Sequence, residues 1–193
     1  GGIYIDDSGM TPVPVSFTNC ILWQNSAYSG GGIYSYKSVV TVTYCTVSGN
    51  SASQNEGGGL YCKNSSEVTV MNSIYWQNTA DVNPEVFYDG SSTLAITYSD
   101  VEGSFIGEGN LNANPLFEDA NNGDFHLKEG SPCIGTGQNG ANIGAYGVGC
   151  YSNLSDPPDT LWTRAFGGSD VDYGKSIHNT SDGGFIIGGT TSS

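Results

Sequence analysis

Short segments in which apolar and polar residues alternate recur along the first half of the chain. Three clear copies begin at Val15, Val40 and Val68, and a weaker copy begins at Leu94. Their starts are 25, 28 and 26 residues apart (15 to 40, 40 to 68, 68 to 94). Alternation with a period of two is typical of β-strands. A repeat length in the twenties indicates stacked units, none of which can bury a core alone.

Glycine-rich blocks lie between these copies. Gly-Gly-Gly-Ile-Tyr-Ser spans 30–35, Gly-Gly-Gly-Leu-Tyr-Cys spans 57–62, and Gly-Gly-Ile-Tyr-Ile at 1–5 resembles the end of an earlier block. Clusters of Gly and Asn favour the tight corners between short strands. Two or three short strands per repeat describe one turn of a parallel β-helix, and the repeat is too short for a βαβ unit. The sequence therefore predicts an all-β fold, a parallel β-helix or β-solenoid.

The repeat spacing also predicts which side chains lie above one another in successive turns. Apolar residues at equivalent positions form three columns, which we expect to build the core. The columns are Val15, Val40, Val68 and Leu94; Phe17, Val42, Val70 and Ile96; and Leu22, Val47, Tyr75 and Val101.

Asparagines recur in the same way. Asn25, Asn50 and Asn78 each lie ten residues into a copy. Stacked corner asparagines can hydrogen-bond along the column and satisfy turn backbone groups that would otherwise be unpaired. The alternative is that asparagine recurs because it tolerates left-handed turns. The sequence leaves both interpretations open.

Two stretches resemble known families. The glycine block with Val-Thr-Val-Thr-Tyr-Cys-Thr-Val-Ser-Gly-Asn-Ser-Ala at 40–52 resembles the right-handed β-helix repeats of bacterial surface proteins, such as the polymorphic outer-membrane protein repeats. Ser-Pro-Cys-Ile at 131–134 and Asn-Ile-Gly-Ala-Tyr-Gly at 142–147 resemble the end of a choice-of-anchor β-helix domain, in which Asp usually stands at the positions of Gly135 and Asn142. The resemblance implies a right-handed parallel β-helix.

The change of pattern along the chain predicts its domains. The repeats and their closing segment form a parallel β-helix over residues 1–150, and the proline-containing stretch 151–159 is a linker. Residues 160–193, with Trp-Thr-Arg at 162–164 and Ser-Asp-Gly-Gly at 181–184, resemble one repeat of secreted bacterial propeller-like proteins. Because a propeller needs several blades, we expect a small C-terminal β-unit whose Ser-Asp-Gly-Gly turn joins two hairpin strands.

Composition narrows the function classes. The 193 residues include 19 Asp and Glu but only five Lys and Arg, for a formal net charge of −14. This charge repels nucleic-acid phosphates and anionic lipids, and no apolar run reaches membrane-spanning length. We expect a secreted, extracellular or cell-surface protein without nucleic-acid partners or membrane insertion. The start at Gly1, without an initiator Met, fits a precursor trimmed during export and equally fits a fragment.

The ends of the predicted solenoid suggest how the protein associates. Uncapped ends expose strand edges, and such an edge is a template for another chain. We expect a structural or adhesive protein that self-associates end to end, or through its C-terminal tail, into a surface fibre. Its partners are copies of itself or neighbouring surface proteins; an excised piece of a longer solenoid is the alternative. The predicted assembly residues are Gly1, Gly2, Ile3, Tyr4 and Ile5, together with Phe185, Ile186 and Ile187 in the tail.

Five cysteines allow disulfides but leave one cysteine unpaired. Cys20 and Cys45 occupy equivalent positions in successive turns, so they should be close enough for a bond if the geometry allows it. Cys133 and Cys150 flank the closing segment, and a bond between them would lock it. Cys62 is then left over.

A carbohydrate-binding or polysaccharide-cleaving β-helix is the alternative function. Lyases of this fold generally use a basic residue, and Lys37 and Lys63 lie beside successive glycine blocks. A solvated face also explains these lysines. Hydrolases pair carboxylates; Asp100 and Glu102 alternate along one strand, but no second turn supplies a partner cluster. We therefore predict no catalytic residue.

One loop offers oxygen ligands for a cation. In Glu-Asp-Ala-Asn-Asn-Gly-Asp at 118–124, the candidate ligands are Asp119, Asn121 and Asp124, with a Gly for the turn as in calcium loops. The loop lacks the full twelve-residue calcium pattern, and an Asn-Gly turn is the alternative. Calcium is the one cofactor that the sequence suggests.

Aromatic residues also recur at equivalent positions. Trp23 and Trp76 share one position, with Ser48 between them, and Tyr34 and Tyr61 share another. Exposed aromatic rows on a flat solenoid face bind glycans or partner proteins. The alternative is that each Trp covers a corner of the core.

Overall fold

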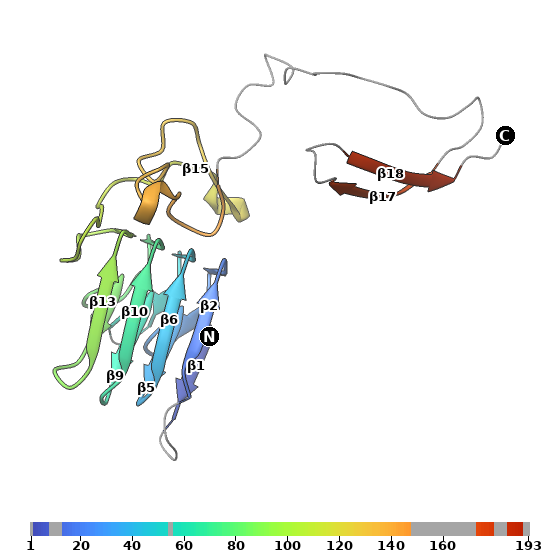
Figure 1. The fold of residues 1–193 in the computed structure, drawn as a ribbon. Helices are drawn as coiled ribbons and strands as arrows, with labels where there is room; N and C mark the ends of the chain where they lie inside the picture. Colours follow the sequence, from blue (N-terminus) through green and yellow to red (C-terminus); the bar gives the residue numbers. More distant parts are fainter. Residues whose placement is uncertain (1, 8–12, 54–55, 148–172, 180–184, 191–193) are drawn as a thin grey trace. The chain divides into compact units, whose positions relative to one another are not determined.

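The structure, a computed structural model, describes residues 2–7, 13–53, 56–147, 173–179 and 185–190 (Figure 1). The chain forms two compact units, Gly1–Ser152 and Asn153–Ser193. Within the described residues, no helix is long and apolar enough to cross a membrane.

The first unit is a parallel β-solenoid, in which each of four turns contributes one strand to each of three sheets (Figure 1). The predicted fold class is therefore confirmed. The first sheet contains β1 (Ile3–Asp6), β5 (Ile33–Tyr36), β9 (Leu60–Lys63) and β12 (Val86–Tyr88). The second sheet contains β2 (Val15–Thr18), β6 (Val39–Thr43), β10 (Glu67–Met71) and β13 (Thr93–Thr97). The third sheet contains β3 (Ile21–Trp23), β7 (Thr46–Ser48), β11 (Ile74–Trp76) and β14 (Asp100–Val101). Strands β4 (Ser26–Ala27) and β8 (Ser51–Ala52) pair at a corner.

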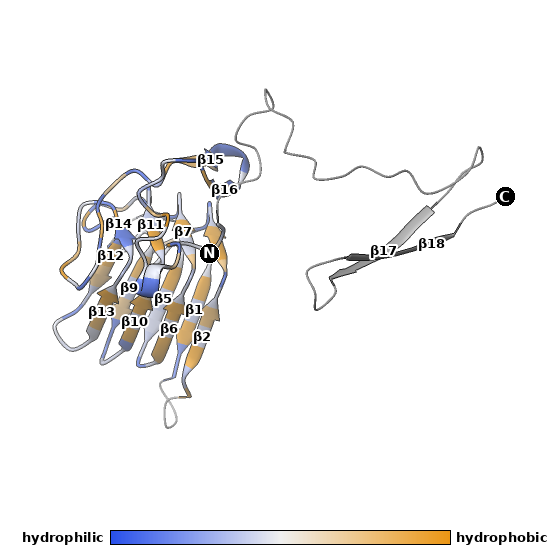
Figure 2. Ribbon diagram, turned by 45° about the horizontal axis from the view of Figure 1, so that its top comes forward, coloured by the Kyte–Doolittle hydropathy of each residue, from blue (hydrophilic) through white to orange (hydrophobic). Residues whose placement is uncertain are grey.

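The strand register confirms the three predicted core columns. In the second sheet Val40 pairs with Val15 on one side and with Val68 on the other. In the third sheet Tyr75 pairs with Val47 and Val101. Figure 2 shows hydrophobic residues along the stacked strands of the solenoid. The alternating pattern works because every second side chain of each strand points into the space that the three sheets enclose.

The asparagine ladder is also confirmed. The backbone N–H and the side-chain Nδ2 of Asn25 both donate to Asn50 Oδ1, at 3.0 Å each. The same two groups of Asn50 donate to Asn78 Oδ1, at 2.9 Å each. Asn50 is fully buried, and its Nδ2 also donates to the Leu22 carbonyl at 2.9 Å. The ladder therefore satisfies corner backbone groups that no strand partner reaches.

A second ladder runs along another corner. The N–H of Cys20 donates to Cys45 Sγ at 3.5 Å, and the N–H of Cys45 donates to Ser73 Oγ at 3.0 Å. The N–H of Ser73 donates to Ser99 Oγ at 3.1 Å, and the N–H of Ser99 donates to Asn110 Oδ1 at 3.1 Å. Cysteine, serine and asparagine side chains at this corner thus each accept a hydrogen bond from the backbone N–H of the corner residue in the preceding turn.

Glycines before the first-sheet strands let successive turns approach closely. A Cβ at Gly32 would lie 2.5 Å from the carbonyl oxygen of Gly59, and a Cβ at Gly59 would lie 2.5 Å from the carbonyl oxygen of Glu85. No side chain fits at that distance from backbone. Glycine is therefore required at this position wherever another turn stacks above it.

The segment from Leu111 onward, which we call the closing segment, covers the outer face of the third sheet. Its antiparallel strands β15 (Phe117–Asp119) and β16 (Asp124–Leu127) flank the 3-10 turn η1 (Ala120–Asn122), and η2 (Gln138–Gly140) follows. A second hydrophobic cluster joins this segment to the sheet. Its buried members are Ile74, Leu127, Cys133 and Ile143, with Trp76, Leu111, Phe117 and Ile134 packed against them.

In the second unit, β17 (Tyr173–Asn179) and β18 (Phe185–Thr190) pair as antiparallel strands, as expected for a hairpin. The predicted Ser-Asp-Gly-Gly turn at 181–184 and the predicted linker at 151–159 lie outside the described residues.

Candidate functional site: a groove at the end of the solenoid

The last turn of the solenoid is only partly covered. The segment after β14 passes over the outer edges of β13 and β14. Tyr98 N–H donates to the Glu108 carbonyl at 2.7 Å, and Val101 N–H donates to the Leu111 carbonyl at 3.0 Å. In the first sheet, β12 pairs with β9, and no described strand pairs with its other edge. The outer edge of β12 therefore stays available at this end.

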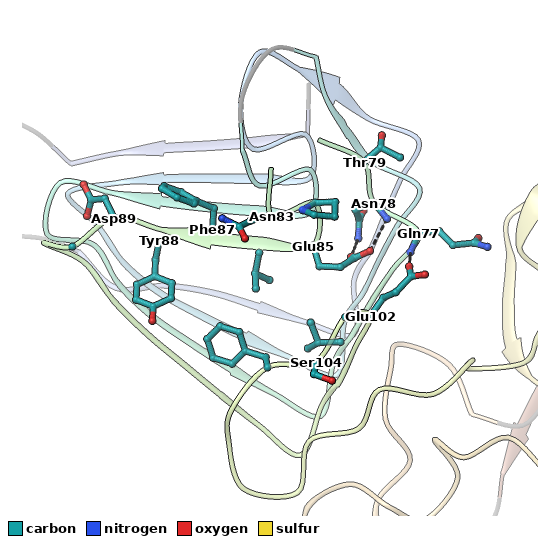
Figure 3. A pocket seen from close by; sticks show the side chains of 16 residues that line it. Gln77, Asn78, Thr79, Asn83, Glu85, Phe87, Tyr88, Asp89, Glu102 and Ser104 are labelled. Carbon is teal, nitrogen blue, oxygen red and sulfur yellow. Dashed lines mark hydrogen bonds between the residues drawn. The ribbon is translucent and has the colours of Figure 1, made fainter. Parts of the chain in front are cut away.

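A hollow of about 1040 Å³ lies beside this edge. We call it the end groove; it is lined by residues 77–79, 83–90 and 101–105 (Figure 3). One wall is apolar and contains Val86, Val101 and Phe105. Tyr88 extends this wall, with its ring edge-on to Phe105 at a centroid distance of 6.3 Å, and is 46% exposed. The end groove is thus the unfilled continuation of the hydrophobic core.

Glu85 forms the polar corner of the end groove and ends the asparagine ladder. Glu85 occupies the position that Gly32 and Gly59 hold in earlier turns. The Leu60 N–H donates to the Glu85 carbonyl, just as the Ile33 N–H donates to the Gly59 carbonyl one turn earlier. Its side chain accepts from Asn78, with Oε1 at 2.9 Å from the backbone N and Oε2 at 2.5 Å from Nδ2. Glu85 therefore replaces the asparagine that a further turn would supply.

A second carboxylate lies next to Glu85. Glu102 is exposed, and its Oε2 accepts the Gln77 N–H at 2.7 Å (Figure 3). Burial raises the pKa of Glu85 most strongly, the hydrogen bonds from Asn78 act in the opposite direction, and the Glu102 carboxylate raises it further. The resulting pKa of Glu85 is about 8, so Glu85 holds a proton at neutral pH.

Asp89 supplies a third carboxylate at the opposite corner. Desolvation acts to raise its pKa, but hydrogen bonds from the Asn64 N–H and from Ser92 and Ser91 prevail and lower it to about 2. Asp89 is therefore an anion at neutral pH. The residues that line the end groove include no Lys, Arg or His. The groove combines an apolar wall, a strand edge and negative charge.

The sequence interpretation found no partner for Glu102 and missed this site. The structure brings Glu85, which precedes β12, beside Glu102, which follows β14, since the two accept the N–H groups of the adjacent residues Asn78 and Gln77. The sequence does contain a feature that marks this site, because Pro84-Glu85 stands where earlier glycine blocks have Gly-Gly. A charged residue at an obligatory glycine position marks the turn on which no further turn stacks.

The four predicted aromatic-face residues do not form one face. Trp23 lies edge-on to Phe125 at 5.8 Å and Trp76 packs against the second hydrophobic cluster, so both are covered by the closing segment. Tyr34 and Tyr61 instead belong to a stacked row of rings on the first sheet. The row is Tyr4, Tyr34, Tyr61 and Phe87, with centroid distances of 5.1, 5.1 and 5.0 Å. Since each ring covers the face of its neighbour, the row stabilises the turns and leaves few ring faces for sugars.

The described cysteines are free thiols, which corrects the predicted Cys20–Cys45 bond. The two residues are adjacent as expected, but each sulfur serves the corner backbone. Cys45 Sγ accepts the Cys20 N–H, and the thiols donate to the carbonyls of Thr18 and Thr43. Cys62 is buried.

The second predicted disulfide is only half described. Cys133 is a buried thiol that donates to Asp100 Oδ2 at 3.2 Å, while Cys150 lies outside the described residues.

The predicted calcium loop forms a turn between β15 and β16. Asp119 Oδ2 accepts from Asn122 Nδ2 at 2.6 Å, and Asp124 Oδ1 lies 2.6 Å from His126 Nδ1. Gly123 completes the turn in the left-handed conformation, with φ of 83°. Among the described residues, no three His, Cys, Asp or Glu side chains gather as a metal site. Calcium binding with Asn121 as a third ligand stays a prediction.

The lysines of the solenoid and the N-terminal assembly residues do not line the end groove. Lys37 Nζ stands 5.4 Å from the centre of the Tyr36 ring, and neither Lys37 nor Lys63 lines the groove. Of the N-terminal assembly residues, Ile3, Tyr4 and Ile5 belong to β1, Gly2 donates its N–H to the Gly31 carbonyl, and Gly1 is not described. Phe185, Ile186 and Ile187 belong to β18.

Comparison with known proteins agrees with this architecture. A family model described as the right-handed β-helix region matches residues 1–119. The chain belongs to this right-handed β-helix family. The comparisons with curated proteins and with solved structures give no significant match.

Proposed function

We propose that the protein is a non-enzymatic, secreted or surface-displayed structural and adhesive solenoid that holds another polypeptide at its end groove. The observation that carries this proposal is the unpaired edge of β12 beside the open hollow. At two other corners, ladders of side chains satisfy backbone N–H groups and join successive turns. An exposed strand edge is the usual acceptor for an added strand from a partner.

The same end argues against regular end-to-end stacking of copies. A further turn on β12 would place a carbonyl oxygen near Glu85 Cβ, as the Glu85 carbonyl stands 2.5 Å from a Cβ at Gly59. The segment 103–111 also covers the edges of β13 and β14. Neighbouring surface proteins are therefore better partners for this end than copies of the chain.

The carbohydrate-cleaving alternative fits the groove poorly. Glycoside hydrolases use two carboxyl groups that both reach the sugar or a water. Glu85 is only 4% exposed, and both of its carboxyl oxygens accept hydrogen bonds from Asn78.

Peptide binding to the full chain tests the proposed function. Short Val- and Thr-rich peptides labelled with a fluorophore should bind, as measured by fluorescence anisotropy. The same peptides with N-methylated backbone amides should not bind, because strand addition needs the peptide N–H groups. Equal binding of both forms, or release of new reducing ends from polysaccharides by the chain, would overturn the proposal.

A further inference from the structure

The end groove has features that select one kind of added strand. In a parallel ladder, alternate residues direct both backbone groups to the same neighbour. The Leu60 N–H donates to the Glu85 carbonyl, and the Asp89 N–H donates to the Cys62 carbonyl. Because backbone groups alternate in direction along the strand, the N–H and C=O of Phe87, between these two residues, also point toward β9. The backbone groups of Val86 and Tyr88 consequently face the end groove. An extended backbone is the complement of this edge.

Charge defines the second feature. Glu85 and Glu102 lie at one corner of the groove, where they accept the neighbouring N–H groups of Asn78 and Gln77, and Asp89 lies at the other corner. Glu102 is exposed, and no Lys, Arg or His among the residues that line the groove neutralises it. A basic side chain is therefore the complement of this corner.

The apolar wall defines the third feature. Val86, Val101 and Phe105 continue the core, and Tyr88 beside them is 46% exposed. Side chains two positions apart in a strand lie on the same face. A strand on β12 that directs one side chain to the carboxyl pair therefore directs the next such side chain to this wall.

We propose that the end groove binds an extended segment of a partner protein that carries a Lys or Arg two positions from an apolar residue. The segment adds as a strand to β12, its basic side chain pairs with the exposed Glu102, and its apolar side chain covers Val86 and Phe105. This inference rests on the proposed function and names the chemistry of the partner.

Two strands of a second copy of this chain can be compared with this requirement. Strand β1, which would continue the solenoid end to end, reads Ile-Tyr-Ile-Asp and contains no basic residue. Strand β17 contains Lys175-Ser176-Ile177, which has the required spacing, but it is already paired with β18. Each copy also carries a net charge of −14, which opposes association of two acidic ends.

Matched peptides and variants of the full chain test the inference. The probes are a Thr-rich peptide with Lys-Thr-Ile at its centre, the same peptide with Gln for Lys, and the N-methylated Lys peptide. We expect the Lys peptide to bind about tenfold more tightly than the Gln peptide, as for other close charge pairs at interfaces. Salt should weaken the Lys peptide more than the Gln peptide.

Glu102→Gln should remove the preference for Lys. Glu67→Gln is the control, because Glu67 is an exposed residue of β10 that does not line the groove. Circular dichroism of each variant verifies that the solenoid is intact. If Glu102→Gln disturbs the last turn, the difference in salt dependence between the two peptides in the wild-type chain decides the question.

The outcomes separate the two proposals. Equal affinity for the Lys and Gln peptides, with no binding of the N-methylated peptide, would overturn the basic-segment inference and leave strand addition standing. Binding of the N-methylated peptide, or of no peptide, would overturn both. A concentration-dependent increase in mass by light scattering would identify a second copy as the occupant and would also contradict the inference.

Discussion

Single polar side chains at the corners determine how the turns are held together. Asn50 is fully buried, accepts two hydrogen bonds from Asn25 and donates to Leu22 and Asn78. Cys45 and Ser73 perform the equivalent task at another corner. Because buried backbone groups are costly when unpaired, these residues contribute to stability although they belong to no hydrophobic column.

Replacing the central asparagine tests this role. Asn50→Ala leaves the N–H of Asn25 and the carbonyl of Leu22 without partners, and we expect unfolding free energy to fall by about 3 kcal/mol. Asn25→Ala is the control, because Asn25 stands at the end of the ladder and is only half buried; its cost should be about 1 kcal/mol. Urea denaturation gives both values. Similar small losses in the two variants would show that the ladder is incidental.

Glu85 should make the solenoid more stable at mildly acidic pH than at alkaline pH. In the unfolded chain its carboxyl titrates near 4.5, whereas in the folded chain its pKa is about 8. Between these values the folded state binds the extra proton, so its contribution is complete below about pH 4.5 and is lost as pH rises to 8. One pKa unit corresponds to about 1.4 kcal/mol, and we expect a total loss of roughly 2–4 kcal/mol.

Denaturation of the wild-type chain and of Glu85→Gln between pH 5 and 9 measures this effect. Asp100, whose pKa burial also raises, is unchanged in the variant and contributes equally to both curves. The wild-type curve should fall with pH more steeply than the Glu85→Gln curve. Parallel curves would mean that Glu85 titrates normally in the folded protein.

The glycines that precede the strands of the first sheet, and the replacement of the last one by Glu85, determine where the stacking of regular turns ends. Gly32 and Gly59 let carbonyls of the next turn lie where a Cβ would stand, and Glu85 at the same position of the last turn does not. A fifth turn stacked like the first four is therefore excluded at Glu85, whereas the outer edge of β12, which follows Glu85, stays open. Segment 103–111 ends the second and third sheets by covering them.

Replacing two different glycines by alanine distinguishes the steric contact at Gly59 from the general effect of losing a glycine. At Gly59 an added Cβ would meet the Glu85 carbonyl at 2.5 Å, so Gly59→Ala should destabilise the fold by about 3 kcal/mol or more. At Gly90 a Cβ would meet no atom within 4 Å, so Gly90→Ala should change stability by less than about 1 kcal/mol. Thermal unfolding followed by circular dichroism compares them, and equal melting temperatures would refute the steric argument.

At the scale of the whole molecule, the closing segment and the end groove divide the surface of the first unit into covered and available parts. The closing segment buries Ile74 and packs against Trp76, which removes the outer face of the third sheet from use. The end groove leaves the outer edge of β12 and the carboxylates of Glu102 and Asp89 accessible to partners. The binding experiments described above therefore address this end of the solenoid.

Much of the fold could be predicted because it is local and repeated. The alternation around Val40 and Val68 indicates strands, and the spacing of 28 residues between them fixes their register. The asparagine ladder follows from the same spacing, since equivalent residues of stacked turns must be neighbours. The candidate site could not be predicted in this way, because Glu85 and Glu102 occupy different positions of one turn and no repeat relates them.

The sequence by itself determined the solenoid and its core columns, because both follow from one short repeat stacked on itself, and it offered the asparagine ladder as one of two interpretations. Only the tertiary structure decided what lies outside the repeat. It showed that the closing segment covers Trp23 and Trp76, that Cys20 and Cys45 are corner residues and not a disulfide, and that Glu85 meets Glu102. The physical reason is that these contacts depend on where a non-repeating segment returns to the solenoid, which periodicity does not encode.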